Sequence, residues 1–241
     1  MFTSRGCPFK CNFCASPVMW NKVRLHSVDY VKGHILYVRK NYNVDAIMFQ
    51  DDVFTMNIDR VESIGSFLKG LGIPYRCLAR AADLTEEMVK LLKDTGCIEV
   101  GVGVESNNQD ILDTMGKRST IEQNAMALSN CKKAGLSVKA FLIIGSPGET
   151  HATILDTIRL LERHTPNDVD CNVLVPYPGT QFYNKIEMYD LKHDNTDSDK
   201  QYLKGKIEGY HPTVSTAGLS SEEIASYRTE IISRFSRVGA R

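Results

Sequence analysis

The spacing of short apolar runs is the feature that most constrains the fold of this chain. Runs of strand length begin near positions 2, 45, 74, 97, 137 and 169, and stretches with helical periodicity separate them. Most intervals are close to the ~30 residues of one strand–helix–strand unit. Such alternation predicts a parallel sheet with right-handed crossovers. Six units ending near residue 180 are too few for a closed eight-stranded barrel of ~250 residues, so we expect an open, partial (β/α)6 TIM-like barrel.

Helix boundary signals lie between these runs. Thr120 with Gln123 and Ser220 with Glu223 form capping boxes, in which a hydroxyl and a side chain three residues later satisfy backbone N–H groups reciprocally. We expect helices at 27–42, 85–95, 120–134, 150–164 and 220–237, and a further one ending near residue 71. The chain therefore divides into a barrel core at 1–180 and a C-terminal extension at 181–241, whose residues 190–206 are polar and predicted to be an exposed connection.

Three cysteines near the N-terminus, Cys7, Cys11 and Cys14, have the spacing C-x3-C-x2-C. Cysteine thiolates are the usual ligands of iron–sulfur clusters, and three thiolates hold three irons of a four-iron cluster. The remaining iron then has an open coordination position, which is where an exogenous ligand binds and chemistry occurs. The spacing therefore favours a cluster with an open site.

Other interpretations of these cysteines stay open at this point. A structural zinc site needs four ligands, and no second cysteine or histidine pair follows. The bacterial ferredoxin run is C-x2-C-x2-C-x3-C-P, which differs in spacing and count. Disulfides are disfavoured because no secretory signal fits before Cys7. The remaining cysteines are singletons and are expected to be small buried hydrophobes: Cys77, Cys97, Cys131 and Cys171.

Charge and hydropathy exclude some classes of partner. The 29 Lys and Arg residues balance 29 Asp and Glu residues, so net charge gives no attraction to nucleic acid or to an anionic membrane. No apolar run approaches the ~20 residues of a membrane span. We expect a cytoplasmic protein without a membrane partner, because a reducing, low-oxygen compartment suits an exposed cluster.

The cysteine motif, with Phe13 before Cys14 and the wider context TSRGCPFKCNFCASP at 3–17, resembles the radical S-adenosylmethionine (SAM) superfamily. In particular it resembles the catalytic domain of the cobalamin-dependent branch, over roughly residues 2–180. The resemblance implies a partial barrel and a [4Fe–4S] cluster whose fourth iron is chelated by SAM. It also implies reductive cleavage of SAM to a 5′-deoxyadenosyl radical, with the cofactors carrying the chemistry and the protein positioning them.

Polar or glycine residues follow almost every predicted strand, at the edge where parallel α/β folds bind ligands. The resemblance implies that Asp51 lies near the methionyl amine of SAM. It further implies that Glu105, with Ser106 beside it, accepts hydrogen bonds from the ribose hydroxyls. The structural alternatives are a helix cap for Asp51 and a helix-dipole partner for Glu105.

The resemblance assigns the other cofactor contacts to two later turns. The main chain at Ile144 and Gly145 is expected to follow the adenine, since glycine lets a backbone approach closely. Tyr177, in the segment PYPGT, is expected to face the adenosyl moiety or the substrate, and Phe13 belongs to the cofactor site through its place in the cysteine motif. Taken alone, the two turns are ordinary connections out of strands.

These observations predict a radical SAM enzyme that abstracts hydrogen from, or methylates, an unknown substrate. It would need an electron donor such as flavodoxin or ferredoxin. The cobalamin domain that precedes the barrel in the resembling branch is not present in this sequence. The chain is therefore expected to be a fragment of a longer protein, to obtain cobalamin from a binding partner, or to abstract hydrogen without cobalamin. The alternative from another class is a non-catalytic iron–sulfur protein for electron transfer or sensing.

Overall fold

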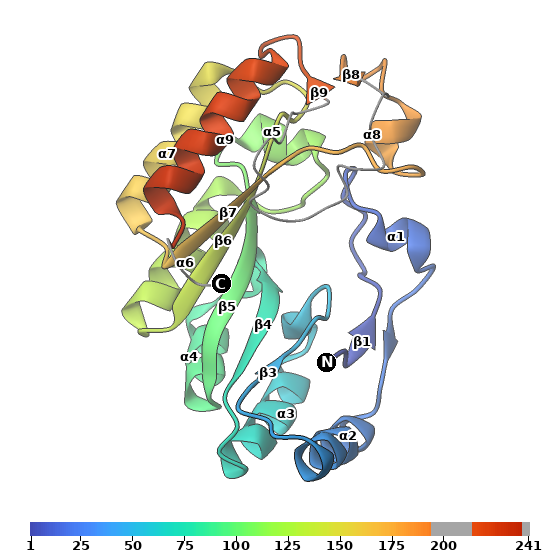
Figure 1. Ribbon diagram of the computed structural model, residues 1–241, viewed down its shortest axis with the longest axis vertical. Coiled ribbons are helices and arrows are strands. Elements are labelled where there is room, and N and C mark those ends of the chain that lie inside the picture. Colours follow the sequence, from blue (N-terminus) through green and yellow to red (C-terminus); the bar gives the residue numbers. More distant parts are fainter. Residues whose placement is uncertain (194–213, 238–241) are drawn as a thin grey trace.

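A five-stranded parallel sheet forms the centre of the structure, a computed structural model that describes residues 1–193 and 214–237. The strand order β3-β4-β5-β6-β7 follows the sequence. The sheet curls into a half-barrel, so the predicted open, partial TIM-like barrel is confirmed (Figure 1). The strand bounds are β3 Ile47–Met48, β4 Tyr75–Arg80, β5 Cys97–Glu105, β6 Ser137–Ile144 and β7 Asp168–Val173.

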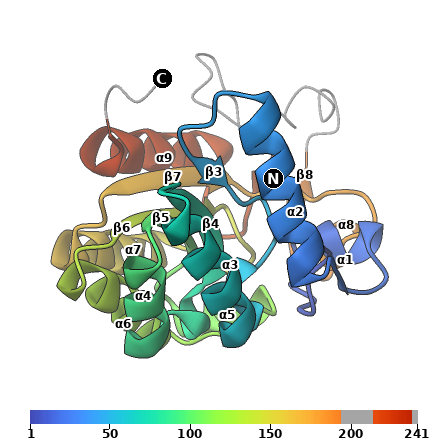
Figure 2. The same cartoon turned by 90° about the horizontal axis from the view of Figure 1, so that it is seen from below.

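Helices connect consecutive strands, and α3, α4 and α6 lie on the same side of the sheet (Figure 2). Both predicted capping boxes are present, at Thr120 before α6 and at Ser220 before α9. The helix bounds are α1 Ser16–Met19, α2 Val28–Asn41, α3 Ile58–Gly70, α4 Glu86–Asp94, α5 Gln109–Thr114, α6 Ile121–Lys133, α7 His151–His164, α8 Gln181–Asn184 and α9 Ser221–Phe235, with 3-10 turns η1 Phe54–Met56 and η2 Ala81–Asp83.

The first predicted strand differs from expectation. Met1 alone continues the parallel sheet, because its N-terminal amine donates to Met48 O (2.7 Å) and its carbonyl accepts from Gln50 N (2.9 Å). The Asp51 side chain then binds the next residues, and Ser4–Arg5 (β1) turns away to pair antiparallel with Arg24–Leu25 (β2). Among the described residues the parallel sheet therefore has five strands, and the expectation of a sixth at the N-terminus is wrong.

The core lies between the sheet and its helices. On strand β6 every second side chain points into this core and is at most 2% exposed: Val138, Ala140, Leu142 and Ile144. The four singleton cysteines are buried free thiols, as expected of small hydrophobes.

The C-terminal extension packs against the free edge of β7. Arg228 Nε on α9 donates to Cys171 O (3.1 Å), and Ser236 Oγ donates to Val169 O, so side chains satisfy carbonyls of the edge strand. The short strands β8 (Lys192–His193) and β9 (Val214–Ser215) pair antiparallel. Most of the predicted connection at 190–206 lies outside the described residues. None of the helices within 1–193 and 214–237 is long and apolar enough to cross a membrane.

Candidate functional site

The cysteine loop begins where β1 ends. Gly6 has φ +85°, a left-handed conformation that favours glycine, and a Cβ there would lie 2.9 Å from Lys22 O. The hairpin of β1 and β2 therefore needs glycine immediately before Cys7. The loop then carries Cys7, Cys11 and Cys14 into α1, where Ser16 N donates to Cys14 Sγ (3.4 Å).

Asn12, between the second and third cysteines, fixes the loop to the rest of the barrel. Its backbone N–H donates to Met115 O (2.8 Å), and its Nδ2 donates to Thr114 O (2.7 Å). Its carbonyl accepts from Phe182 N (3.1 Å). These three bonds join the loop to the ends of α5 and α8, which are distant in sequence. The loop is thus held on both sides.

The three thiols are half-buried and form no disulfide. Burial raises the pKa of each, to about 11 for Cys14, and the three groups interact electrostatically with one another. In the part of the chain that the structure describes, no three His, Cys, Asp or Glu side chains are close enough to share one metal ion. In a four-iron cluster each thiolate binds its own iron, so three cysteines match three of the four irons.

Two cations lie beside the cysteine loop. The Arg80 guanidinium, at the end of β4, stands 3.5 Å over the centre of the Phe9 ring and donates to Lys117 O (2.7 Å) and Arg118 O (3.0 Å). Lys117 Nζ lies 6.0 Å from the centre of the Phe13 ring. Both cations lower the pKa of Cys7 and Cys11, against the larger effect of burial. A site that holds thiolates benefits from such nearby positive charge.

Glu105, the last residue of β5, occupies a constrained position. Its φ is +62°, which is uncommon for a residue other than glycine, and its side chain forms a buried ion pair with Lys117 Nζ (2.5 Å). The buried Asn124 Nδ2 donates to Val104 O (3.1 Å) and Ser106 O (3.0 Å) and so spans the turn. Strained backbone that its surroundings hold in place is typical of functional sites.

The two aspartates after β3 have different surroundings. Asp51 is 2% exposed, and its carboxylate accepts from Thr3 N (2.6 Å), Ser4 N (3.2 Å) and Thr3 Oγ1. Asp52 is exposed, accepts from Ser16 Oγ (2.5 Å), and its charge acts on Cys7 and Cys14. Neither caps α3, whose N-cap is Asn57. The structure thus gives Asp51 contacts with the N-terminal segment, and it is Asp52 that lies beside the cysteine loop.

The turn after β6 begins at Ile144, which is 1% exposed. Gly145 has φ +79°, and its N–H donates to Glu149 Oε2 (2.5 Å), as does Ser146 N (3.2 Å). Burial raises the pKa of the Glu149 carboxyl to about 7, although these two N–H groups oppose that effect. A Cβ on Gly145 would meet Val214 at 3.2 Å, so this turn also packs against the C-terminal extension.

Tyr177 and Phe13 complete the predicted set. Tyr177 is half-buried in the turn after β7, where its carbonyl accepts from Thr180 N (3.0 Å) and Thr180 Oγ1 (2.7 Å). Phe13 is half-buried and packs against the core. All the predicted residues lie at or after the carboxyl ends of strands, or on the cysteine loop. As cofactor-binding residues they stay predictions.

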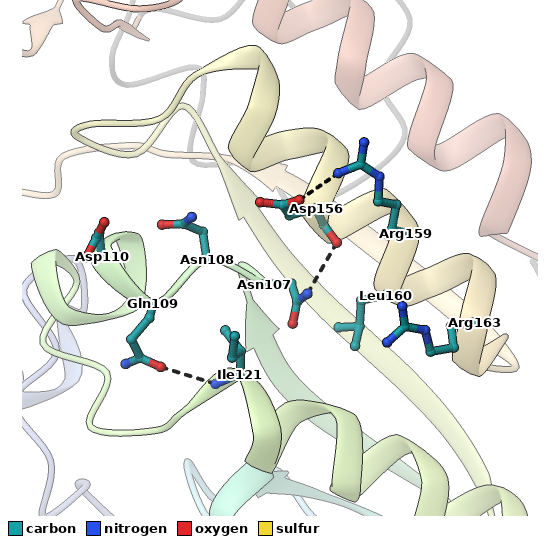
Figure 3. Close-up of a pocket in the computed structure, with 9 residues that line it drawn as sticks. All are labelled: Asn107, Asn108, Gln109, Asp110, Ile121, Asp156, Arg159, Leu160 and Arg163. Carbon is teal, nitrogen blue, oxygen red and sulfur yellow. Dashed lines mark hydrogen bonds and ion pairs between the residues drawn. The ribbon is translucent and has the colours of Figure 1, made fainter.

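A pocket of about 420 Å³ lies apart from the cysteine loop, between the start of α5, the start of α6 and α7 (Figure 3). Its side chains are bonded to one another or to backbone: Asn107 Nδ2 donates to Asp156 O (3.3 Å), and Asp156 pairs with Arg159 (2.8 Å). Gln109 Oε1 accepts from Ile121 N (3.3 Å). These bonds support the chain just after Glu105 and Ser106, and the pocket contains none of the predicted site residues.

Sequence reasoning missed Lys117, and it placed Asp52 and Glu149 after strands of the sheet without giving either a role. Lys117 follows the short helix α5, and no periodicity or motif indicates that it returns to Glu105. Asp52 directly follows Asp51, and which of the two aspartates faces the loop depends on the direction of each side chain. Glu149 lies in the turn GSPGET at 145–150, and an acidic residue four positions after a glycine is the local signal that could indicate a carboxylate binding the backbone.

A parallel half-barrel with three thiols and two cations at the carboxyl edge of its strands defines a cofactor-dependent α/β protein of the iron–sulfur class. Residues 1–161 match the profile of the Radical SAM superfamily. The chain belongs to the radical SAM superfamily. Members of this family use a [4Fe–4S] cluster and SAM, and the three thiols of the cysteine loop are donors of the kind that such a cluster takes.

Named relatives span methyltransferases and cyclases. The chain is 35% identical over 186 residues to the uncharacterized methyltransferase PH0819 of Pyrococcus horikoshii, covering 76% of this chain and 40% of that protein. It is 28% identical over 200 residues to the anaerobic magnesium-protoporphyrin IX monomethyl ester cyclase of Rubrivivax gelatinosus, covering 80% of this chain and 36% of that protein. The chain thus spans well under two thirds of the length of these relatives.

Solved structures support the fold. The radical SAM methyltransferase TsrM from Kitasatospora setae, with tryptophan and a SAM analogue bound, superimposes with a TM-score of 0.77 over 96% of this chain and 51% of that one, at 16% identity. The cobalamin-dependent radical SAM enzyme OxsB superimposes with a TM-score of 0.60 over 79% of this chain and 29% of that one, at 23% identity. A non-catalytic iron–sulfur role is not favoured by these relatives.

Proposed function

We propose that this chain is the catalytic core of a radical SAM enzyme that acts by hydrogen abstraction from, or methylation of, an organic substrate. The observation that carries the proposal is the cysteine loop, which Asn12 fixes beside the buried Glu105–Lys117 pair at the carboxyl edge of the sheet. A bound cluster and SAM would supply a 5′-deoxyadenosyl radical there. The methyltransferase names among the relatives favour methylation as the reaction class.

The residues of the chain would then have distinct roles. Cys7, Cys11 and Cys14 would hold three irons. Glu105 would accept hydrogen bonds from the ribose hydroxyls, because a carboxylate can accept from two donors. Lys117 would lie where its ammonium attracts the carboxylate of SAM, since it already pairs with a carboxylate in this position.

The remaining predicted residues would contact SAM, with the exception of Asp51. Ser106, Ile144, Gly145, Tyr177 and Phe13 would line the adenosyl side. Asp51 would act chiefly by positioning the N-terminal segment that leads into the cysteine loop, because both of its oxygens already accept hydrogen bonds there. Cobalamin, where used, would come from a part of the protein outside this chain or from a partner. The cytoplasm, which keeps thiols reduced, would suit these ligands.

The test uses anaerobic reconstitution with iron and sulfide, followed by reduction and an assay for 5′-deoxyadenosine. The wild-type chain is expected to bind a four-iron cluster and to release 5′-deoxyadenosine and methionine from SAM. Cys11→Ala should lose both, while Cys131→Ala, a buried thiol on α6, should keep both. A reconstituted cluster that is reduced but never cleaves SAM would instead support the electron-transfer alternative. Cobalamin titration of the same sample addresses methylation.

A further inference from the structure

The chain leaves β5 through a tight turn at Glu105. Glu105 has φ +62°, and Ser106 N donates to Val104 O (2.8 Å), so this hydrogen bond spans only two residues. The geometry is that of a γ-turn with positive φ, which is rare and strained for a residue that has a side chain. Such a conformation persists only where its surroundings hold it. Contacts with other elements must therefore keep Glu105 in this turn.

Asn124, the fourth residue of α6, holds both sides of the turn. Its Nδ2 group donates to Val104 O (3.1 Å) and to Ser106 O (3.0 Å), and the residue is 0% exposed. Thr157 on α7 acts further along the chain, where its Oγ1 accepts from Asn107 N (2.9 Å). Among these contacts it is the Asn124 amide that joins the residue before the turn to the residue after it.

The orientation of the Asn124 amide follows from what it faces. Both neighbouring groups are carbonyl oxygens, which only accept hydrogen bonds, so the NH₂ end of the amide must face them. Its Oδ1 is buried and has no hydrogen-bond partner among the described residues. A buried acceptor without a donor is costly. The two bonds that hold the turn are the reason why this side chain keeps such an arrangement.

The turn also directs the Glu105 carboxylate back over its own strand. A Cβ on Gly103 would clash with Glu105 Oε1 and with Lys117 Nζ, so the carboxylate and its ammonium partner lie against the Gly103 backbone. In an extended strand the side-chain direction is set by the backbone conformation. If Glu105 relaxed to a negative φ, its Cα–Cβ bond would turn and the carboxylate would leave this position.

We infer that Asn124 is a positioning residue for nucleoside recognition: by holding the turn, it keeps the Glu105 carboxylate where it accepts hydrogen bonds from the cis-diol of a ribose. This inference rests on the proposed function, which gives Glu105 the ribose hydroxyls. It adds that the ribose site is formed without the cluster, because both sides of the turn are bonded within the protein. A site built to bond hydroxyls discriminates strongly against a ligand that lacks them.

The first experiment compares two nucleosides that differ only in the diol. Adenosine and 2′,3′-dideoxyadenosine are titrated calorimetrically into the reconstituted chain and into its metal-free form, and neither nucleoside has the amino acid group that chelates iron. Wild type is expected to bind adenosine at least about tenfold more tightly than dideoxyadenosine in both forms. Asn124→Leu should weaken adenosine binding at least about fivefold and change dideoxyadenosine binding by less than about twofold. An adenosine preference in Asn124→Leu equal to that of wild type would overturn the inference.

Asn130 provides a matched control on the same helix. It is 4% exposed, and its Nδ2 donates to Leu84 O (3.0 Å), a carbonyl outside the turn. Asn130→Leu therefore makes the same change of side chain and removes the same kind of buried hydrogen bond. It should keep the wild-type preference for adenosine, even where thermal melting shows that both variants are less stable. Equal loss of the preference in both variants would show general damage to the fold, and the inference would be wrong.

The second experiment measures the turn itself and needs no ligand. Amide hydrogen exchange over residues 104–108, followed by mass spectrometry, reports local opening of the turn. Exchange there should be at least about tenfold faster in Asn124→Leu than in Asn130→Leu, because only the first variant loses the bonds to both sides of the turn. Asn124→Ala gives the same comparison with a smaller side chain that a helix accepts readily, in case leucine prevents folding. Equal exchange rates in the Asn124 and Asn130 variants would overturn the inference.

These measurements distinguish failure of the inference from failure of the proposed function. A wild-type chain that prefers adenosine but forms no 5′-deoxyadenosine from SAM after reconstitution and reduction would refute the radical chemistry and leave the role of Asn124 supported. A chain that cleaves SAM while Asn124→Leu keeps the full adenosine preference would refute the role of Asn124 alone. A wild-type chain without any preference for adenosine would refute both the ribose role of Glu105 and this inference.

Discussion

Replacing Asp51 by alanine tests what this buried carboxylate does. The carboxylate accepts hydrogen bonds from Thr3 N, Ser4 N and Thr3 Oγ1, and it joins the N-terminal segment to the end of β3. Its charge also acts on Arg60, which donates to Thr3 O (3.0 Å). Asp51→Ala leaves three donors without an acceptor in a region where water has little access. The neighbouring Asp52→Ala is the matched control, because Asp52 is exposed and bonds only Ser16 among the contacts described.

The expected loss of stability in Asp51→Ala follows from the hydrogen bonds that the variant lacks. A buried donor left without its partner costs about 1–3 kcal/mol, and breaking a buried charged network costs about 3–5 kcal/mol in total because such losses are not additive. We therefore expect Asp51→Ala to lower the free energy of unfolding by about 3–5 kcal/mol. Asp52→Ala should change it by less than about 1 kcal/mol, as is usual for an exposed pair.

Urea unfolding of the metal-free chain, followed by circular dichroism, measures the difference in the free energy of unfolding between the two variants. With a slope of roughly 3 kcal/mol per M, the midpoint of Asp51→Ala should fall by roughly 1 M or more relative to Asp52→Ala. Equal midpoints for the two variants would refute the structural reasoning. Asp51→Asn adds a second readout: if it keeps wild-type stability but loses SAM affinity, Asp51 contacts the cofactor directly.

Three further predictions follow from the site. Glu149→Gln should remove a pH dependence of stability. The folded-state pKa of Glu149, about 7, lies above the ordinary 4.5, so the stabilising contribution of this carboxyl is fully present below pH 4.5 and is lost as pH rises through 7. The melting temperatures of wild type and variant, measured from pH 5 to 8, should therefore diverge. Gly103→Ala should weaken SAM binding, because a Cβ at this position would lie 2.4 Å from Glu105 Oε1 and 2.6 Å from Lys117 Nζ. Gly33→Ala on α2, where a Cβ would have nothing within 4 Å, should leave SAM affinity unchanged. Equal SAM affinities of the two variants in equilibrium dialysis would contradict this prediction. Lys117→Met should lower the free energy of unfolding by about 3 kcal/mol by leaving the Glu105 carboxylate buried and unpaired, and a chemical melt equal to wild type would show that the pair adds nothing.

Sequence periodicity was sufficient for most of the fold. Strands and helices form where apolar spacing and capping residues place them, as the boxes at Thr120 and Ser220 show. The exception is the N-terminal segment, since only Met1 joins the parallel sheet and Asp51 redirects the chain at Thr3. A side chain that replaces a backbone ladder leaves no periodic signal.

The sequence by itself predicts Cys7, Cys11 and Cys14 as cluster ligands and the carboxyl edge of the sheet as the place of the site, because both predictions depend on residues close together in the chain. Tertiary structure decided that Lys117 pairs with Glu105, that Asp52 rather than Asp51 lies beside the cysteine loop, and that Asn12 holds the loop to α5 and α8. These contacts join residues separated by 12 or more positions, and which side chain meets which depends on how packed elements orient them. Local pattern carries no information on that orientation.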